Sequence, residues 1–206
     1  SGVPTPEWSI EEFDGIRTLA VHRYDRNIGG DPLHRRIHQE DLCLALGIRP
    51  EEKYATSHRS RATVSKMASV VFENSSHPKE DLQAFVTTLV ANIAMGNADA
   101  HARNLSLLHD PDGAVRLAPV YDVIPTYHYP NHSRHLAQPV NRNVFRPESV
   151  TGSHLLDEVM SWGIPNTKPC LEEAVLRVES ALEDVELPLE SVELRALLSS
   201  YGRLRL

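Results

Sequence analysis

Apolar side chains recur at helical spacing through the middle of the chain. Between Pro78 and Gly96 they stand three and four residues apart: Leu82, Phe85, Val86, Leu89 and Ile93. This period places them on one face of a helix, and a glycine after the last apolar position is a common helix stop. The pattern therefore predicts an amphipathic helix that ends at Gly96 and gives rigid support to the loop that follows.

Shorter helices are indicated on the N-terminal side of this helix. Residues 40–46 carry an apolar pattern that ends at Gly47, and residues 63–72 carry another that breaks at Asn74-Ser75-Ser76.

The C-terminal third is also expected to be helical. Ser153 can cap a helix that reaches Trp162. Thr167 can cap a second helix through about residue 184, and residues 189–200 form a third. The apolar face of the second helix is expected to join the core: Leu171, Val175, Val178 and Leu182.

Two stretches alternate as strands do. Residues 105–109 and 114–118 flank Asp110-Pro111-Asp112-Gly113, which is turn chemistry, so we expect a β-hairpin. Residues 15–24 predict a further strand. Residues 1–14, which contain two prolines, are expected to form a mobile lead-in, and residues 125–147 a long loop.

Composition narrows the class of protein. With 206 residues, of which 41% are hydrophobic, the chain can bury a proper core. The net charge of −7 argues against broad affinity for nucleic acid, which needs clustered Lys and Arg. Cys43 and Cys170 are far apart and are interpreted as thiols, which suits a reducing cytoplasm. No apolar run is long enough for a bilayer, so no membrane partner is expected.

The residues that follow Gly96 have the pattern of a phosphoryl-transfer site. Asp99 and Asn104 are five residues apart, and Asp122 follows the expected hairpin. In protein kinases, an Asp-x-x-x-x-Asn loop supplies the base and a Mg²⁺ ligand, and a later Asp completes the metal site. Because a hairpin returns the chain beside its start, Asn104 and Asp122 are expected to end near each other. On its own, the five-residue spacing also occurs by chance in polar loops.

At these residues the chain resembles the HipA-type serine/threonine kinases, which are toxins of bacterial toxin–antitoxin pairs. The resemblance lies in Gly96-Asn97-x-Asp99-x-His101-x-Arg103-Asn104 and in Leu117-Ala118-Pro119-Val120-Tyr121-Asp122. Residues 18–26 resemble the hinge strand of that family, and residues 38–47 its next helix. The resemblance implies a mainly α fold with a small β-hairpin, of the type of a protein-kinase C-terminal lobe.

The resemblance also implies a domain organisation and site roles. Residues 15–206 would form the kinase-like domain, with the hinge at about 19–26, the catalytic core at 78–126 and a helical part at 151–206. Asp99 would be the general base, and Asn104 and Asp122 the Mg²⁺ ligands. The remaining residues expected to bind ATP are His22, Arg23, Tyr24, Asp25, His101, Ala102, Arg103 and Tyr121. The first three would contact the adenine edge through their backbone, and Asp25 would lie near the ribose.

The chain departs from the family pattern in three respects. His22 stands where Glu is usual, which matters little for a backbone contact, and Arg103 stands where Lys is usual, which keeps the charge but changes its geometry. No glycine-rich loop or strand lysine precedes the hinge, because only about twenty residues lie before it. We therefore expect a C-terminal lobe without most of its N-terminal lobe.

The partners that the resemblance implies are those of a toxin kinase. They are ATP, Mg²⁺, a protein substrate for which an aminoacyl-tRNA synthetase is one candidate, a helix-turn-helix antitoxin, and an N-terminal lobe in cis or in trans. Phosphorylation would restrain translation or growth.

Two other functions stay open at this stage. The chain could be a non-catalytic or split-kinase module that docks an antitoxin or a separate lobe. A metallophosphoesterase is a distant alternative, because Asp99-Ala100-His101 is also an Asp-x-His pair. Histidines elsewhere are interpreted as surface residues rather than zinc ligands: His34, His38, His128, His132 and His135.

Overall fold

The computed structural model describes residues 2–26, 36–55, 62–143, 146–183 and 192–206. Within these ranges the helices are α1 (Leu42–Ala45), α2 (Val64–Asn74), α3 (Pro78–Met95), α4 (Gly152–Met160), α5 (Thr167–Glu183) and α6 (Val192–Ser199). Two antiparallel sheets accompany them. One is the pair β1 (Trp8–Phe13) and β2 (Ile16–Val21), and the other has the order β3 (His38–Asp41), β4 (Ser106–His109), β5 (Val115–Leu117).

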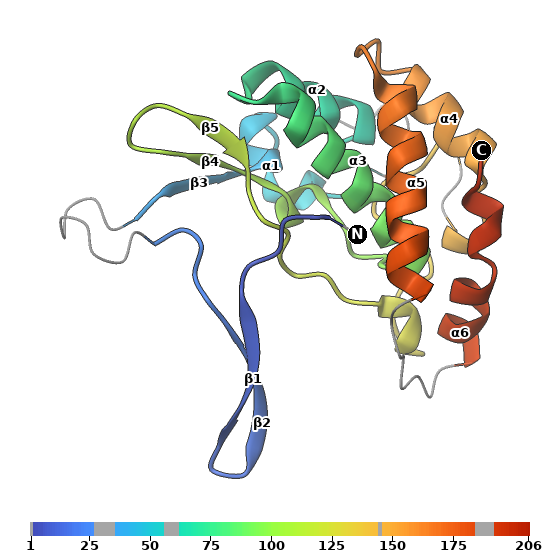
Figure 1. Ribbon diagram of the computed structural model, residues 1–206, viewed down its shortest axis with the longest axis horizontal. Coiled ribbons are helices and arrows are strands. Elements are labelled where there is room, and N and C mark those ends of the chain that lie inside the picture. Colours follow the sequence, from blue (N-terminus) through green and yellow to red (C-terminus); the bar gives the residue numbers. More distant parts are fainter. Residues whose placement is uncertain (1, 27–35, 56–61, 144–145, 184–191) are drawn as a thin grey trace.

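Helix α3 lies at the centre of the helical body, between α2 and α5 (Figure 1). Its side chains Phe85, Val86 and Val90 are buried, and the Phe85 ring meets the edge of Trp162 with ring centroids 6.0 Å apart. Burial of one large apolar side chain contributes about 1.5–3 kcal/mol. The helix is therefore firmly packed in the core, and it gives rigid support to the loop that begins at its C-terminal end.

The ends of the two central helices agree with the predictions. The Thr63 side chain accepts a hydrogen bond from the Lys66 backbone at the start of α2. Helix α3 begins with Pro78 and ends at Gly96, which has φ +67° and donates its N–H back to the last turn. This left-handed conformation suits glycine, and it turns the chain out of the helix.

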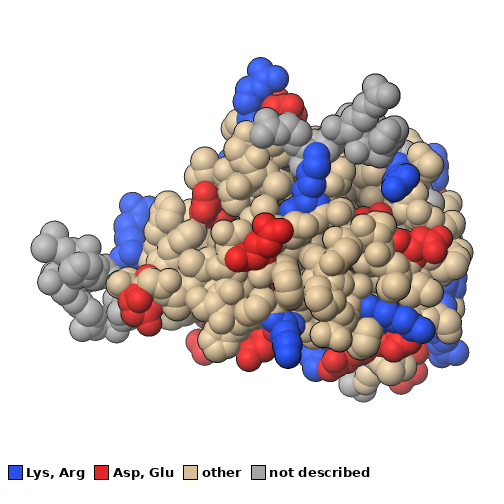
Figure 2. Space-filling model, turned by 90° about the horizontal axis from the view of Figure 1, so that it is seen from above, with Lys and Arg blue, Asp and Glu red and all other residues tan. Residues whose placement is uncertain are grey.

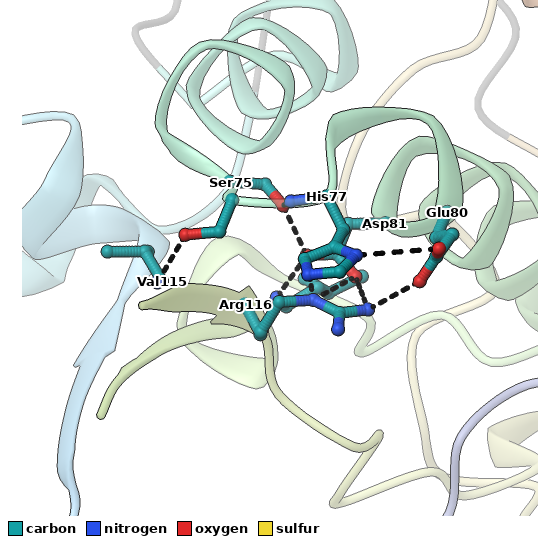
Figure 3. A network of polar contacts seen from close by, with 8 residues as sticks. Ser75, His77, Glu80, Asp81, Val115 and Arg116 are labelled. Atoms are coloured by element: carbon teal, nitrogen blue, oxygen red, sulfur yellow. Dashed lines mark hydrogen bonds and ion pairs between the residues drawn. The ribbon is translucent and has the colours of Figure 1, made fainter. Parts of the chain in front are cut away.

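A buried carboxylate fastens the three-stranded sheet to the helices (Figure 3). Asp81, in the first turn of α3, is 3% exposed and accepts hydrogen bonds from the Arg116 guanidinium, from the Leu117 N–H at 2.8 Å and from the Ser75 hydroxyl at 2.6 Å. The Ser76 hydroxyl accepts a further hydrogen bond from the Val115 N–H. The sheet thus takes a defined position against α2 and α3.

The other sheet is a hairpin that extends away from the helical body (Figure 1). Its turn, Asp14-Gly15, has positive φ at both residues, which is the conformation that Asp-Gly favours between two strands. Large apolar side chains on it are exposed: Trp8, Ile10, Phe13, Ile16, Leu19 and Val21.

Three expectations about secondary structure need correction. Residues 8–13, expected within a mobile lead-in, form β1, because the Asp14-Gly15 turn folds them back on β2. Residues 38–41, read as the start of a helix, form β3, whose backbone pairs with β4. Thr151 rather than Ser153 caps α4. The expected helix ends at 184 and 189–191 lie outside the described residues.

Charged side chains of both signs are interspersed over the face shown in Figure 2. No helix in the described parts of the chain is long and apolar enough to cross a bilayer. Both cysteines are free thiols, Cys43 buried and Cys170 half-buried, in agreement with the prediction that they form no disulfide.

Candidate active site

The loop after α3 is held by its own asparagine and by a threonine from further along the chain. Asn97 accepts from the Asp99 N–H at 3.1 Å and donates to the Asn92 side chain at 3.0 Å. The buried Thr126 hydroxyl donates to the Gly96 carbonyl at 2.9 Å and accepts from the Ala98 N–H at 2.8 Å. Thr126 therefore ties the start of the loop to the segment that follows Asp122.

Asp99 presents a half-exposed carboxylate that receives one strong donor. The Tyr54 hydroxyl donates to its Oδ1 at 2.6 Å, and the side chain of Asp99 is 51% exposed. Burial, the hydrogen bond to Asp99 and the charge of Asp99 raise the pKa of Tyr54 to about 12. Tyr54 thus stays a hydroxyl donor at neutral pH, and one edge of the carboxylate is free to meet a substrate proton.

His101 lies buried between charged groups. Its Nε2 is 2.6 Å from the Lys53 Nζ and 3.9 Å from the Asp99 carboxylate. Burial and the Lys53 charge lower the pKa of His101, against the opposing effects of Asp99 and Asp122. The ring is therefore neutral at pH 7. Its pKa is influenced by Asp99 and Asp122, the two carboxylates identified from the sequence.

Asn104 and Asp122 line the same small cavity, as the hairpin prediction requires. The Asn104 amide nitrogen donates to the Asp99 carbonyl at 2.9 Å, which leaves its oxygen without a partner among the described residues. The Asp122 carboxylate likewise receives no hydrogen bond from them, and Asp122 has φ +55°. An amide oxygen and a carboxylate are ligands that Mg²⁺ accepts, so this donor set fits that ion.

No group of three or more His, Cys, Asp or Glu side chains that could hold a metal occurs among the residues for which coordinates are described. His34 lies outside those residues, so the His34 and His38 pair is not tested there. A metal at Asn104 and Asp122 would take its remaining ligands from phosphate and water.

A directed chain of hydrogen bonds joins Tyr24, in the segment predicted to be the hinge, to the loop after α3. The Tyr24 hydroxyl donates to Gln39 at 3.3 Å, and Gln39 donates to the Ser106 hydroxyl at 3.0 Å. Ser106 and Tyr121 are in hydrogen-bond contact, and the Tyr121 hydroxyl donates to the Arg103 carbonyl at 2.7 Å. Because the Tyr121 hydroxyl donates its hydrogen to the Arg103 carbonyl, the Ser106 hydroxyl must donate to the Tyr121 oxygen. Every link therefore points from the hinge toward the loop.

The hinge residues themselves are occupied by local contacts. The His22 N–H donates to the Glu7 carbonyl at 2.8 Å. Asp25 is buried, and both of its oxygens bind arginines, with Arg23 bidentate and Arg26 on one oxygen. Hydrogen bonds from Arg23 hold the pKa of Asp25 below its usual range. The Asp25 carboxylate binds Arg23 and Arg26 in this structure, and its expected place near a ribose stays a prediction.

Arg103 and Ala102 occupy the short turn before Asn104. The Arg103 guanidinium lies 3.5 Å from Asp41, whose other oxygen caps α1, and Ala102 is buried. Arg103 is therefore positioned through its pairing with Asp41.

An open cleft of about 700 Å³ borders Asp99. Its walls come from the loop at 125–147 and from the segment before residue 56, and its lining includes Tyr54, Asp99, Thr126, His132 and His135. Sequence reasoning missed Lys53, Tyr54 and Thr126. No spacing signal links them to Asp99, because only the folded chain brings the three segments together.

Comparisons with known proteins indicate the family to which the chain belongs. Residues 1–184 match the family described as the HipA-like C-terminal domain. The chain is 34% identical over 203 residues to the putative kinase Y4mE of Sinorhizobium fredii, and the match covers 94% of this chain and 47% of that protein. It is 27% identical over 203 residues to the serine/threonine-protein kinase toxin HipA of Shewanella oneidensis, with 93% and 46% covered.

Two solved structures share the fold. HipA of Shewanella oneidensis, solved in a complex with HipB and operator DNA, superposes with a TM-score of 0.74 at 24% identity and covers 98% of this chain and 50% of that one. The Helicobacter pylori proinflammatory kinase CtkA superposes with a TM-score of 0.54 at 13% identity, with 97% and 77% covered. The fold is thus that of a kinase-like C-terminal lobe.

The chain spans about half the length of the curated relatives it matches most fully. The match to the family covers most of its residues, and the loop from Gly96 to Asn104 lies within the matched range. This protein belongs to the family of HipA-like C-terminal domains.

Proposed function

We propose that this chain is the catalytic part of an ATP-dependent protein serine/threonine kinase. The proposal rests on one hydrogen bond within the loop, which the Asn104 amide donates to the Asp99 carbonyl. This bond sets the base and the metal-ligand oxygen in a fixed relation, and Asp122 reaches the same cavity from the other side of the hairpin.

The proposed reaction uses each group for one task. Asp99 accepts the proton of a substrate hydroxyl, the hydroxyl oxygen forms a bond to the γ-phosphorus, and the bond from that phosphorus to the ADP oxygen breaks. Mg²⁺, when bound, would neutralise charge on the phosphates. Asn104 and Asp122 would hold it through oxygen, and Tyr121 would hold the segment that carries Asp122.

Wider roles follow from the relatives and are part of the proposal. A relative of this chain is named a toxin, and a structure of it contains HipB. We infer that this protein acts in the cytoplasm on a protein hydroxyl, with an aminoacyl-tRNA synthetase as one candidate substrate, and that an antitoxin restrains it. ATP would reach the hinge at His22, Arg23 and Tyr24.

A non-catalytic binding module is the second candidate function. The exposed apolar side chains of the β1–β2 hairpin favour it, because large apolar patches mark interaction surfaces. A metallophosphoesterase gains no support from the described residues, which contain no group of three or more His, Cys, Asp or Glu side chains that could hold a metal.

The test is phosphoryl transfer by Asp99→Asn, in a protein extended to the full length of its kinase relatives. Loss of a general base typically costs about 10²- to 10⁴-fold in rate. We expect transfer to fall by that factor while the affinity for ATP stays nearly unchanged, and Asp112→Asn in the exposed hairpin turn is the matched control. Undiminished single-turnover transfer by folded Asp99→Asn would refute the assignment of the base.

A further inference from the structure

Lys53 comes from a segment remote in sequence from the catalytic loop, yet it is fastened to it. Its carbonyl accepts a hydrogen bond from the Ala102 N–H at 3.3 Å and another from the Gln138 side chain at 3.2 Å. The first contact is to the loop that carries Asp99, and the second is to the long loop that lines the cleft. The backbone of Lys53 therefore has a set position relative to the site.

The imidazole of His101 lies between the Lys53 ammonium and the Asp99 carboxylate. An ammonium carries only donors, so the 2.6 Å contact requires Nζ to donate to the His101 Nε2, which puts the ring hydrogen on Nδ1. The same Nε2 lies 3.9 Å from the Asp99 Oδ1. The ammonium and the carboxylate thus flank a single ring nitrogen.

A second contact leads from Lys53 to Asp99. The ammonium lies 4.9 Å from the centre of the Tyr54 ring, and the Tyr54 hydroxyl binds the Asp99 carboxylate. Both contacts hold the ammonium beside the base without joining it to the base directly.

The charge of Lys53 has no carboxylate partner within 4.0 Å among the described residues. Arg103, in the same neighbourhood, differs in this respect because it pairs with Asp41. His101 is 5% exposed, and its Nδ1 has no hydrogen-bond partner in the described structure. Lys53 is a half-buried residue beside this ring, and a partly buried charge is costly unless an anion compensates it. Two of the three donors of the ammonium are left for that anion.

We propose that Lys53 is a catalytic residue that binds the oxygens of the phosphoryl group in transfer. The inference rests on the proposed kinase function and adds a cation that lies outside the catalytic loop. The substrate oxygen bonds to the γ-phosphorus, its proton moves to Asp99, and the bond from that phosphorus to the ADP oxygen breaks. The negative charge on the phosphoryl oxygens then meets the free donors of Lys53. His101 keeps the ammonium from forming an ion pair with the base.

The first test compares Lys53→Met, Lys53→Arg and Lys79→Met in a protein extended to the full length of its kinase relatives. Lys79 is an exposed lysine at the start of α3 and serves as the matched control. Loss of one such donor typically costs about 10²- to 10³-fold in kcat. We expect that loss in Lys53→Met with little change in the KM for ATP, a partial recovery in Lys53→Arg, and unchanged kinetics in Lys79→Met. Thermal melting verifies the fold of each variant.

The second test asks whether the γ-phosphate reaches Lys53. Acetylation of lysines, followed by mass spectrometry, is measured with MgATP and with MgADP. We expect MgATP to protect Lys53 far more than MgADP does, and neither to protect Lys79. If kcat falls in Lys53→Met but both nucleotides protect Lys53 equally, the residue only positions His101, and the proposal is wrong.

The outcomes separate this inference from the proposed function. Normal kcat in Lys53→Met, with transfer abolished in Asp99→Asn, would overturn the role of Lys53 and leave the kinase intact. Absence of transfer by the wild-type protein, with γ-phosphate protection of Lys53, would support the phosphate site and overturn the kinase. If the wild-type protein shows neither phosphoryl transfer nor γ-phosphate protection of Lys53, both the kinase function and the role of Lys53 are wrong.

Discussion

The β1–β2 hairpin and the β3–β4–β5 sheet are both small and antiparallel, but among the described residues only the second packs extensively against the helices. Leu107 in β4 is 1% exposed, whereas Leu19 in β2 is 60% exposed. The second sheet carries a buried carboxylate contact at Asp81 and the hydrogen bonds of Ser106. The β1–β2 hairpin leads into the segment predicted to be the hinge, and its apolar side chains face solvent.

This difference assigns the two sheets different tasks. The anchored sheet can set Asn104 and Asp122 against each other within one cavity, because its strands cannot shift without breaking buried contacts. The hairpin has no such restraint in the described structure. The geometry of the proposed metal site would therefore depend on the anchored sheet, whereas no comparable contacts fix the β1–β2 hairpin in the described structure.

The largest expected effect is on the anchor itself. Asp81→Ala leaves the Leu117 N–H and much of the Arg116 guanidinium without an acceptor, and breaking a buried charged pair costs about 3–5 kcal/mol. Glu80→Ala removes the exposed partner of the same arginine and is expected to cost under about 1 kcal/mol. Urea unfolding of both variants gives the comparison, and equal losses would show that Asp81 is not the anchor.

A matched pair of leucines tests the contrast between the sheets directly. Leu107→Ala removes a buried side chain and is expected to lower the free energy of unfolding by about 2–5 kcal/mol. Leu19→Ala removes an exposed one and should change it by under about 0.5 kcal/mol. A large loss in Leu19→Ala would mean that the hairpin is covered in solution.

A smaller effect is expected from the chain of hydrogen bonds between hinge and loop. Ser106→Ala leaves the Gln39 amide and the Tyr121 hydroxyl oxygen without their buried partner, at a cost of about 1–3 kcal/mol. Ser9→Ala in β1 removes only an exposed bond to Glu11, so it should be nearly silent. Chemical unfolding measures both losses. An unchanged free energy of unfolding in Ser106→Ala would show that this series of hydrogen bonds does not stabilise the protein.

The sequence predicted the parts of this structure that depend on local periodicity. Helix α3, its stop at Gly96 and the hairpin of β4 and β5 follow from side-chain spacing and turn residues. Strand β3 did not, because His38–Asp41 is polar throughout and becomes a strand only by pairing its backbone with β4. Strand β1 was missed although Asp14-Gly15 marks its turn.

The same limit applies to the candidate site. Asp99, Asn104 and Asp122 could be named because they share a fixed spacing and flank one hairpin. Lys53, Tyr54 and Thr126 reach the loop from other segments through contacts of 2.6 Å to 2.9 Å. Tertiary packing creates these contacts, and no periodic pattern in the chain records them.

The central claim is that the anchored sheet brings Asn104 and Asp122 to one Mg²⁺ ion, and calorimetric titration of ATP with and without Mg²⁺ tests it most directly. In the protein extended to the full length of its kinase relatives, and in its control variant Asp112→Ala, Mg²⁺ should strengthen ATP binding. In Asp122→Ala, the account predicts that the effect of Mg²⁺ is largely lost while metal-free binding is kept, because a carboxylate ligand is gone. An equal loss of affinity with and without Mg²⁺ would show that Asp122 is structural and would contradict the claim.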